Sequence, residues 1–261
     1  VNEAKTAVAE VWGRKFLGYA LLRHAGRVQC AVAEPSLQRL RARLREIEPE
    51  APIVTAVSAS GSAGTLGAGD WLKEKLGAQI VAVEALECPT MLYNGFGEHN
   101  IQGIGDKHIP LIHNVTNTDV AVAVSDHATD QLFVLFNDPA GLALLRSRGV
   151  SEDVLAALPH FGLSSICNIV AAIKTAKTLG LGSSQALITV ATDGAALYTS
   201  EFAKAKAKHF GAGFGTAQAT QTYATHITQA DTQHVLPLTE VERRRIFNLG
   251  YYTWVEQQGV P

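Results

Sequence analysis

The sequence predicts an α/β fold: a three-layer, mostly parallel sheet with helices on both faces, and helical extensions at the N- and C-terminal ends. Apolar runs at residues 53–57, 79–85, 120–124 and 186–191 alternate with segments of helical spacing. Such near-continuous runs are typical of strands that are buried on both faces. The first two runs enclose a helical segment within about thirty residues, which is one βαβ unit of a parallel sheet.

The composition fits a large folded domain and argues against several other classes. The chain has 261 residues, 47% of them hydrophobic, which allows one large domain or two small ones. A net charge of −2 gives no electrostatic reason to expect nucleic acid or an anionic membrane as a partner. Three scattered cysteines suit neither a disulfide framework nor a metal site, and no stretch reaches the about 18 apolar residues of a membrane span. We therefore expect a cytoplasmic protein without a metal.

Three parts are expected along the chain: an N-terminal helical segment (1–48), a central α/β domain (49–200) and a C-terminal helical extension (201–261). Residues 4–24 carry apolar side chains at steps of three and four, which predicts one or two helices. Residues 27–32 are ambiguous between a short strand and other structure. A further helix is expected from Pro35 to about Ile47, with its basic residues on a solvated face.

Glycine and capping residues predict the ends of the central helices. The helix of the βαβ unit is expected over residues 70–76, with Gly77 ending it. Ser125 can cap the helix that follows the strand at 120–124, and Asn137-Asp138-Pro139 breaks that helix. Residues 164–180 form a strongly periodic helix ahead of the last strand.

The C-terminal extension begins with a lysine- and alanine-rich helix at 201–209. Residues 210–235 are rich in Gly, Ala, Thr and Gln and are expected to form a loosely ordered connection. Thr239 and Glu242 have the spacing of a capping box and open a last helix. Its aromatic end is expected to dock on a surface, either of the same domain or of a partner: Tyr251, Tyr252 and Trp254.

A loop of small residues after the first strand could bind a phosphate group. It reads Gly61-Ser62-Ala63-Gly64-Thr65 and runs into the helix of the βαβ unit. Small residues let backbone N–H groups approach an anion, and a helix start adds unpaired N–H donors and partial positive charge. The loop has neither the Lys-Ser/Thr pair of a Walker loop nor Gly-x-Gly-x-x-Gly spacing. A tight turn without a ligand is the alternative.

Four stretches stand in one order along the chain: Gly-Ser-Ala-Gly-Thr at 61–65, Asn-Ile-Gln-Gly-Ile-Gly-Asp-Lys-His-Ile-Pro at 100–110, Gly-Leu-Ser-Ser at 162–165 and Ile-Thr-Val-Ala-Thr-Asp-Gly-Ala-Ala-Leu-Tyr at 188–198. This order resembles the C-terminal half of the cysteine synthase-like enzymes. These are pyridoxal-phosphate (PLP) enzymes of the fold that includes the tryptophan synthase β chain. The resemblance covers roughly residues 50 to 200. The first three stretches match the family's Gly-Thr-Gly-Gly-Thr, Ile-Gln-Gly-Ile-Gly and Gly-Ile-Ser-Ser.

The resemblance implies PLP as cofactor and makes the central part a PLP-fold cofactor domain. It implies two groups of cofactor-binding residues, at the phosphate (Gly61, Ser62, Ala63, Gly64 and Thr65) and at the ring (Gly103, Ile104 and Gly105). At the pyridine nitrogen the family commonly has Ser. Two alignments stay open here, one placing Asp193 and the other Gly194 at that nitrogen. A carboxylate there would keep the pyridine protonated and strengthen the electron sink.

Two departures from the family concern catalysis. The family's Schiff-base lysine lies in its N-terminal half, in a segment such as Ser-x-Lys-Asp-Arg, and no lysine of this chain has that context. The Thr-Ser-Gly-Asn loop that binds the substrate carboxylate is also absent from the sequence. The catalytic residue is therefore unknown. The chain begins with Val1 rather than Met, and we expect the lysine to come from a missing N-terminal half or from a second PLP-fold subunit.

Two functions follow from the resemblance. The first is a PLP-dependent lyase or transferase that acts on an amino acid by β-elimination or β-replacement. In it, this chain would hold the cofactor phosphate within a heteromeric complex. The alternative is a non-catalytic PLP-fold subunit that stabilises or regulates a homologous active partner. A phosphate-ligand binder without PLP is a third, weaker interpretation.

The segment 86–119 lacks periodicity, and a loop of that length is usually functional. It contains His99, His108 and His113, but no carboxylate or cysteine spacing around them indicates a metal site. Cys88 and Cys167 are expected to be small buried residues rather than nucleophiles.

Overall fold

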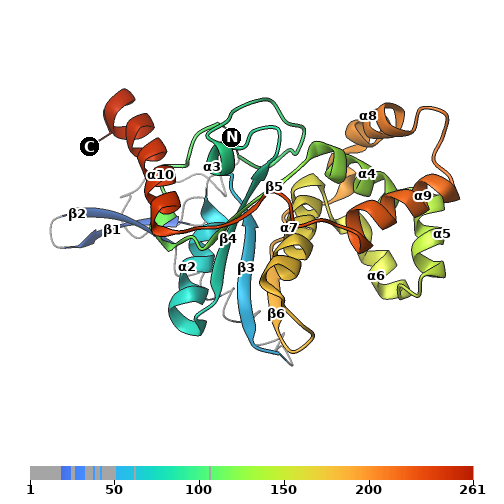
Figure 1. Ribbon diagram of the computed structural model, residues 1–261, viewed down its shortest axis with the longest axis horizontal. Coiled ribbons are helices and arrows are strands. Elements are labelled where there is room, and N and C mark those ends of the chain that lie inside the picture. The colour runs from blue at the N-terminus through green and yellow to red at the C-terminus, as the bar shows by residue number, and fades with distance from the viewer. Residues whose placement is uncertain are drawn as a thin grey trace, which may run out of the picture. The chain divides into compact units, whose positions relative to one another are not determined.

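The computed structural model describes residues 19–24, 27–32, 38, 42, 51–61, 63–105 and 107–260 (Figure 1). The chain divides into two compact units, Val1–Glu50 and Ala51–Pro261, and each is described by itself. In the first unit, β1 (Tyr19–His24) and β2 (Arg27–Val32) pair as an antiparallel hairpin.

This hairpin contradicts the helix predicted over residues 4–24, because residues 19–24 form a strand. The ambiguous run at 27–32 is the partner strand. Only Ala25 and Gly26 separate the two strands in the sequence, and a two-residue connection with glycine favours a hairpin. Cross-strand pairing outweighs a weak helical spacing here. The rest of that predicted helix, residues 4–18, lies outside the described residues, whereas Gln38 and Ala42 are helical as expected.

The second unit is built on a five-stranded sheet in the order β6-β3-β4-β5-β7. Its strands are β3 (Ile53–Ala59), β4 (Gln79–Ala85), β5 (Val120–Val124), β6 (Ala186–Thr189) and β7 (Val235–Pro237). The first four in the chain are parallel to one another, and β7 is antiparallel to β5. All four predicted strands are confirmed, while β7 begins at Val235, the last residue of the region expected to be a loose connection.

Helices cover both faces of this sheet because alternate strand residues point to opposite sides. They are α2 (Gly64–Leu76), α3 (Thr90–Tyr93), α4 (Asp126–Asn137), α5 (Pro139–Ser147), α6 (Glu152–Ala157), α7 (Leu163–Leu179), α8 (Thr199–Phe210), α9 (Thr216–Tyr223) and α10 (Glu240–Tyr251). Figure 1 shows α2 and α7 on opposite sides of the sheet.

Each face has its own hydrophobic core. Val57, Val81 and Val83 pack against α4 and α7, with Leu132, Phe133, Ile166 and Val170. On the other face, Ile80, Ala82 and Ala121 pack against α2, α3 and α10, with Leu66, Met91 and Ile246. Full burial of one Val, Leu, Ile, Phe or Met side chain contributes about 1.5–3 kcal/mol. The predicted α/β architecture with helices on both faces is confirmed.

The predicted helix boundaries follow from local chemistry. The Ser125 hydroxyl accepts a hydrogen bond from the Ala128 N–H, and Asp138 caps α5 directly after the break. Gly77 ends α2 in the left-handed conformation, with φ 70°. Thr239 and Glu242 form the expected capping box at the start of α10.

Two predictions in the second unit are wrong. The helix expected from residue 70 begins at Gly64, because the glycine-rich loop itself turns into the first helical turn. Residues 210–235 are not a loose connection, since they contain α9 and the π-helical turn Ala224–Thr228. The composition there is poor in large apolar residues, but Ala219 and Thr222 are buried. Small buried side chains together with Phe214, Tyr223 and Ile227, which pack against the core, order this segment.

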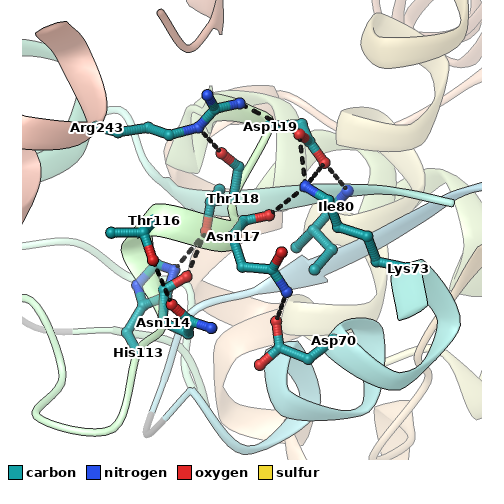
Figure 2. A network of polar contacts seen from close by, with 10 residues as sticks. All are labelled: Asp70, Lys73, Ile80, His113, Asn114, Thr116, Asn117, Thr118, Asp119 and Arg243. Carbon is teal, nitrogen blue, oxygen red and sulfur yellow. Dashed lines mark hydrogen bonds and ion pairs between the residues drawn. The ribbon is translucent and has the colours of Figure 1, made fainter. Parts of the chain in front are cut away.

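A polar network attaches α10 to the sheet (Figure 2). The Asp119 carboxylate accepts hydrogen bonds from the Ile80 N–H at 2.8 Å and from Lys73 Nζ of α2 at 2.7 Å. Arg243 of α10 donates to the same carboxylate at 3.2 Å and to the Thr118 carbonyl at 2.7 Å. One aspartate at the start of β5 therefore connects α2, β4 and the C-terminal helix.

The strand order reverses between β3 and β6, so the carboxyl ends of these two strands are where a ligand-binding crevice is expected. From β3 the chain proceeds to β4 and β5 on one side, and β6 is added on the other side of β3. In open parallel sheets, ligands bind outside the carboxyl ends of the strands where the strand order reverses. Within the described residues, no helix combines the length and the apolar composition that crossing a membrane requires.

Candidate functional site

The loop after β3 presents the start of α2 to this crevice. Ala63 adopts the left-handed conformation, with φ 61°, and precedes the first helical residue, Gly64. The N-cap residue Ala63 makes no side-chain cap hydrogen bond, and no acidic residue lies in the first turn of the helix. The first N–H groups of a helix have no intrahelical acceptor, so α2 offers donors and partial positive charge at this point.

Hydroxyl groups and the sheet hold the loop in place. The side chains of Ser58 and Thr65 are hydrogen-bonded to each other across the loop. The Ser60 N–H donates to the Val83 carbonyl of β4 at 2.8 Å. The loop that the sequence singled out is thus fixed at both of its ends, while Ser62 at its centre lies outside the described residues.

The glycine segment 103–105 packs directly on this loop. The Gly105 N–H donates to the Ser60 carbonyl at 2.7 Å. A Cβ on Gly105 would lie 2.4 Å from the same carbonyl oxygen, and a Cβ on Gly61 would lie 3.3 Å from the Gly103 carbonyl oxygen. Gly103 has φ +86°, a conformation that L side chains rarely adopt. These glycines are required because two backbone segments touch.

The start of α7 completes the contact between the predicted stretches. A Cβ on Gly103 would lie 3.6 Å from Ser164 Oγ, so this hydroxyl faces the glycine segment. Ser164 Oγ lies 3.3 Å from Thr192 Oγ1, and the Gly162 N–H donates to the Asp193 carbonyl at 2.8 Å. The four stretches, far apart in the sequence, therefore meet at the carboxyl ends of β3 and β6.

Asp193 and Gly194 are the two candidates for the residue at the pyridine nitrogen, and they have different surroundings. The Asp193 carboxylate accepts hydrogen bonds from the Tyr198 hydroxyl and, at 3.4 Å, from the Thr192 hydroxyl. A Cβ on Gly162 would lie 2.6 Å from Asp193 Oδ1, which places this carboxylate against the start of α7. A Cβ on Gly194 would instead lie 2.9 Å from the Pro159 carbonyl oxygen. Asp193 is thus the one of the two whose side chain lies among the other site residues.

The Asp193 carboxylate also changes the pKa of Tyr198, its hydrogen-bond partner. Burial, together with the hydrogen bond to Asp193 and its negative charge, raises the pKa of Tyr198 to about 12. Tyr198 therefore stays protonated at neutral pH and remains a donor to Asp193.

Asn168 is a site-supporting residue that sequence reasoning missed. Its side-chain oxygen accepts from the Ala59 N–H at 2.7 Å, and its side-chain nitrogen donates to the Val190 carbonyl at 2.9 Å. These bonds tie the end of β3 to the chain just after β6, beneath the crevice. The signal available in the sequence was a polar residue among the apolar positions of a predicted helix. In the structure this side chain is 4% exposed.

Cys88, Cys167 and His113 play no part in this contact. Cys88 and Cys167 are free and buried as expected, and burial raises the pKa of the Cys167 thiol. His113 lies against Thr118, with Nε2 2.9 Å from the threonine hydroxyl. Within the described ranges, no group of three or more His, Cys, Asp or Glu residues could hold a metal ion.

The residues of the crevice fit PLP by the chemistry of their donors. An uncapped helix start with a hydroxyl beside it suits a phosphate dianion. Gly103 and Gly105 carry no side chain, so their backbone can border a flat ring. A carboxylate at Asp193, held by a protonated tyrosine, suits a pyridinium nitrogen.

Comparison with known proteins gives partial matches. No family model matches the sequence. Cysteine synthase B of Campylobacter jejuni is 41% identical over 85 residues, which cover 32% of this chain and 28% of that protein.

Solved structures match over a longer part. A cysteine synthase from Entamoeba histolytica matches with a TM-score of 0.51 and 23% identity, over 72% of this chain and 49% of that one. The O-acetylserine sulfhydrylase isoform 3 of the same organism matches with a TM-score of 0.51 and 22% identity, over 70% and 49%. The chain thus spans about half the length of these solved structures and less of the curated relative. Over 85 residues the sequence is similar to cysteine synthase B, and over most of its length the fold is similar to that of the two Entamoeba histolytica enzymes.

Proposed function

We propose that this chain holds PLP within a PLP-dependent lyase or transferase that acts on an amino acid by β-elimination or β-replacement. The observation that carries the proposal is the contact between residues 61–65, 103–105, 162–165 and 192–193 above β3 and β6. A structural turn alone does not need these distant stretches to converge on an uncapped helix start. The relation to cysteine synthase B supports the choice of cofactor and reaction class.

Each part of the crevice would have one task. The first N–H groups of α2 and the Thr65 hydroxyl would bind the phosphate. The backbone of residues 103–105 would border the ring, and Asp193, oriented by Tyr198, would hold a proton on the pyridine nitrogen. When bound, PLP supplies an electron sink for the carbanion at the amino-acid Cα. The residues of this chain would orient that sink and keep it protonated.

The lysine that must form the Schiff base would come from outside this chain. None of its lysines has the Ser-x-Lys-Asp-Arg context, and the Thr-Ser-Gly-Asn loop for the substrate carboxylate is absent from the sequence. The chain corresponds to about half of the solved structures that it matches. We therefore propose a second PLP-fold subunit, or further residues of the same protein, as the partner in a heteromeric or composite site.

A second function is favoured by the same missing segments. A PLP-fold chain without its own lysine and carboxylate loop could stabilise or regulate a homologous active partner without taking part in the chemistry. Under this alternative the partner would have a complete site of its own.

The absorbance spectrum of the natively isolated complex separates the two functions. Under either function, borohydride reduction and peptide mapping should find the modified lysine outside residues 1–261, on a second subunit or on further residues of the same protein, so the effect of Asp193 on the spectrum has to separate the two. If the first function is correct, substitution of Asp193 by Ala in this chain will change the visible band. If the spectrum and the turnover of the complex are unchanged by Asp193→Ala, the result supports the non-catalytic role. Absence of any aldimine band would remove the proposed enzyme function.

A further inference from the structure

We propose that His99 is a positioning residue for the ring-lining segment 103–105, which it holds through the Gly105 carbonyl. The proposal rests on the proposed function, because the segment matters only if it borders a cofactor. His99 lies outside the four stretches that carry the family resemblance to the phosphate and pyridine sites.

The hydrogen bond of His99 has one possible direction. Its Nε2 lies 2.8 Å from the Gly105 carbonyl oxygen. A carbonyl oxygen only accepts, so Nε2 must carry the hydrogen and donate it. The Nδ1 atom is buried without a hydrogen-bond partner among the described residues. The bond to Gly105 is thus what orients this imidazole.

Gly105 is held on two sides as a result. Its carbonyl accepts from His99, and its N–H donates to the Ser60 carbonyl at 2.7 Å. A Cβ on Gly105 would lie 2.4 Å from that Ser60 oxygen, so the two backbones are already in contact. A shift of Gly105 would therefore displace either the ring-lining segment or the phosphate loop.

The residue next to His99 is anchored independently, which gives the imidazole a fixed base. The Asn100 N–H donates to Asp126 Oδ2 at 2.7 Å, and its side-chain nitrogen donates to Asp130 Oδ1 at 3.1 Å. Glu87 accepts from the Asp126 N–H at 3.0 Å. The histidine therefore transmits the position of α4 to the glycine segment.

Three variants test the role. In His99→Gln an amide nitrogen takes the place of Nε2 and can still donate to Gly105, whereas in His99→Leu no donor remains. His113→Leu is the matched control, because His113 lies in the same long segment and its Nε2 contacts Thr118 instead. Its Nδ1 is likewise buried without a partner.

The first readout is the hydrogen exchange of the Gly105 amide in the protein without any ligand. We expect His99→Leu to speed this exchange about five- to tenfold, the loss expected for one hydrogen bond. His99→Gln and His113→Leu should leave it within about twofold of the wild type. Equal exchange in His99→Leu and His113→Leu would overturn the proposal.

The second readout is the affinity for pyridoxine 5′-phosphate, which has the ring and the phosphate but no aldehyde, compared with inorganic phosphate. His99→Leu should weaken the first ligand more than the second, and His99→Gln should restore it. Equal weakening of both ligands would indicate a general structural role and contradict the proposal. A wild-type protein that binds neither ligand would count against the proposed function, while the exchange of Gly105 would still decide the role of His99.

Discussion

Glu84 is a buried side chain that should make the free energy of unfolding depend on pH. It lies on β4 at 6% exposure, and its two oxygens accept from the N–H groups of Met91 at 2.8 Å and Leu92 at 2.9 Å. Desolvation outweighs these bonds and raises the pKa of the carboxyl to about 7. The folded state therefore holds a proton that the unfolded chain has already lost above pH 4.5.

We predict that Glu84 lowers the free energy of unfolding as the pH rises from 4.5 to about 7. The contribution is full below the unfolded pKa and is lost as the pH passes the folded one. The whole loss is about 3 kcal/mol. Urea unfolding at pH 4, 6 and 8 should show this fall in the wild type relative to Glu84→Gln. Parallel curves for the two proteins would contradict the prediction.

At the scale of elements, the start of α2 is the part of the site whose loss should separate binding from folding. Gly64→Leu would place a branched side chain where the phosphate is proposed to bind. We expect affinity for PLP or phosphate to fall at least tenfold with little change in the thermal midpoint. Gly182→Leu is the control, since nothing lies within 4 Å of a Cβ there. Equal loss of affinity and midpoint in Gly64→Leu would indicate a structural turn.

The C-terminal helix should stabilise the end of the stretch 100–110. Trp254, in the π-helical turn after α10, donates from Nε1 to the Ile109 carbonyl at 2.6 Å. We predict that Trp254→Phe lowers the free energy of unfolding by about 1 kcal/mol, because the buried carbonyl loses its donor. Tyr252→Phe, at an exposed position, should change it by less than about 0.5 kcal/mol. Equal effects of the two substitutions in denaturant unfolding would exclude this role for Trp254.

At the scale of the whole molecule, the edge strand β6 could pair with a strand of a partner. Among the described strands β6 pairs only with β3, and its apolar residues Leu187 and Ile188 are half-buried. Unpaired strand edges are a liability for an isolated chain. A cofactor ring bordered from one side would also stay open to water, which a closed active site excludes.

We therefore predict that residues 1–261 do not turn over an amino acid alone. Activity should require a polypeptide, or further residues of the same protein, that supplies the lysine. Size-exclusion chromatography and turnover assays of the isolated and co-expressed chains would test this. A monodisperse, folded monomer with amino-acid turnover would refute the prediction.

Local chemistry was enough to predict the fold class, the four parallel strands and the caps at Ser125 and Thr239. Burial on both faces and side-chain capping are properties that a short stretch of sequence expresses. Tertiary contacts decided the rest. The β1–β2 hairpin, α9 and β7 depend on pairing and packing with distant residues, which override weak local spacing. Likewise, Asn168 and His99 are distinguished from other polar residues only by their partners in space, because a hydrogen bond needs a donor and an acceptor brought together by the whole fold. The sequence named Asp193 beside Gly194, and the contact with Tyr198 is what separates the two.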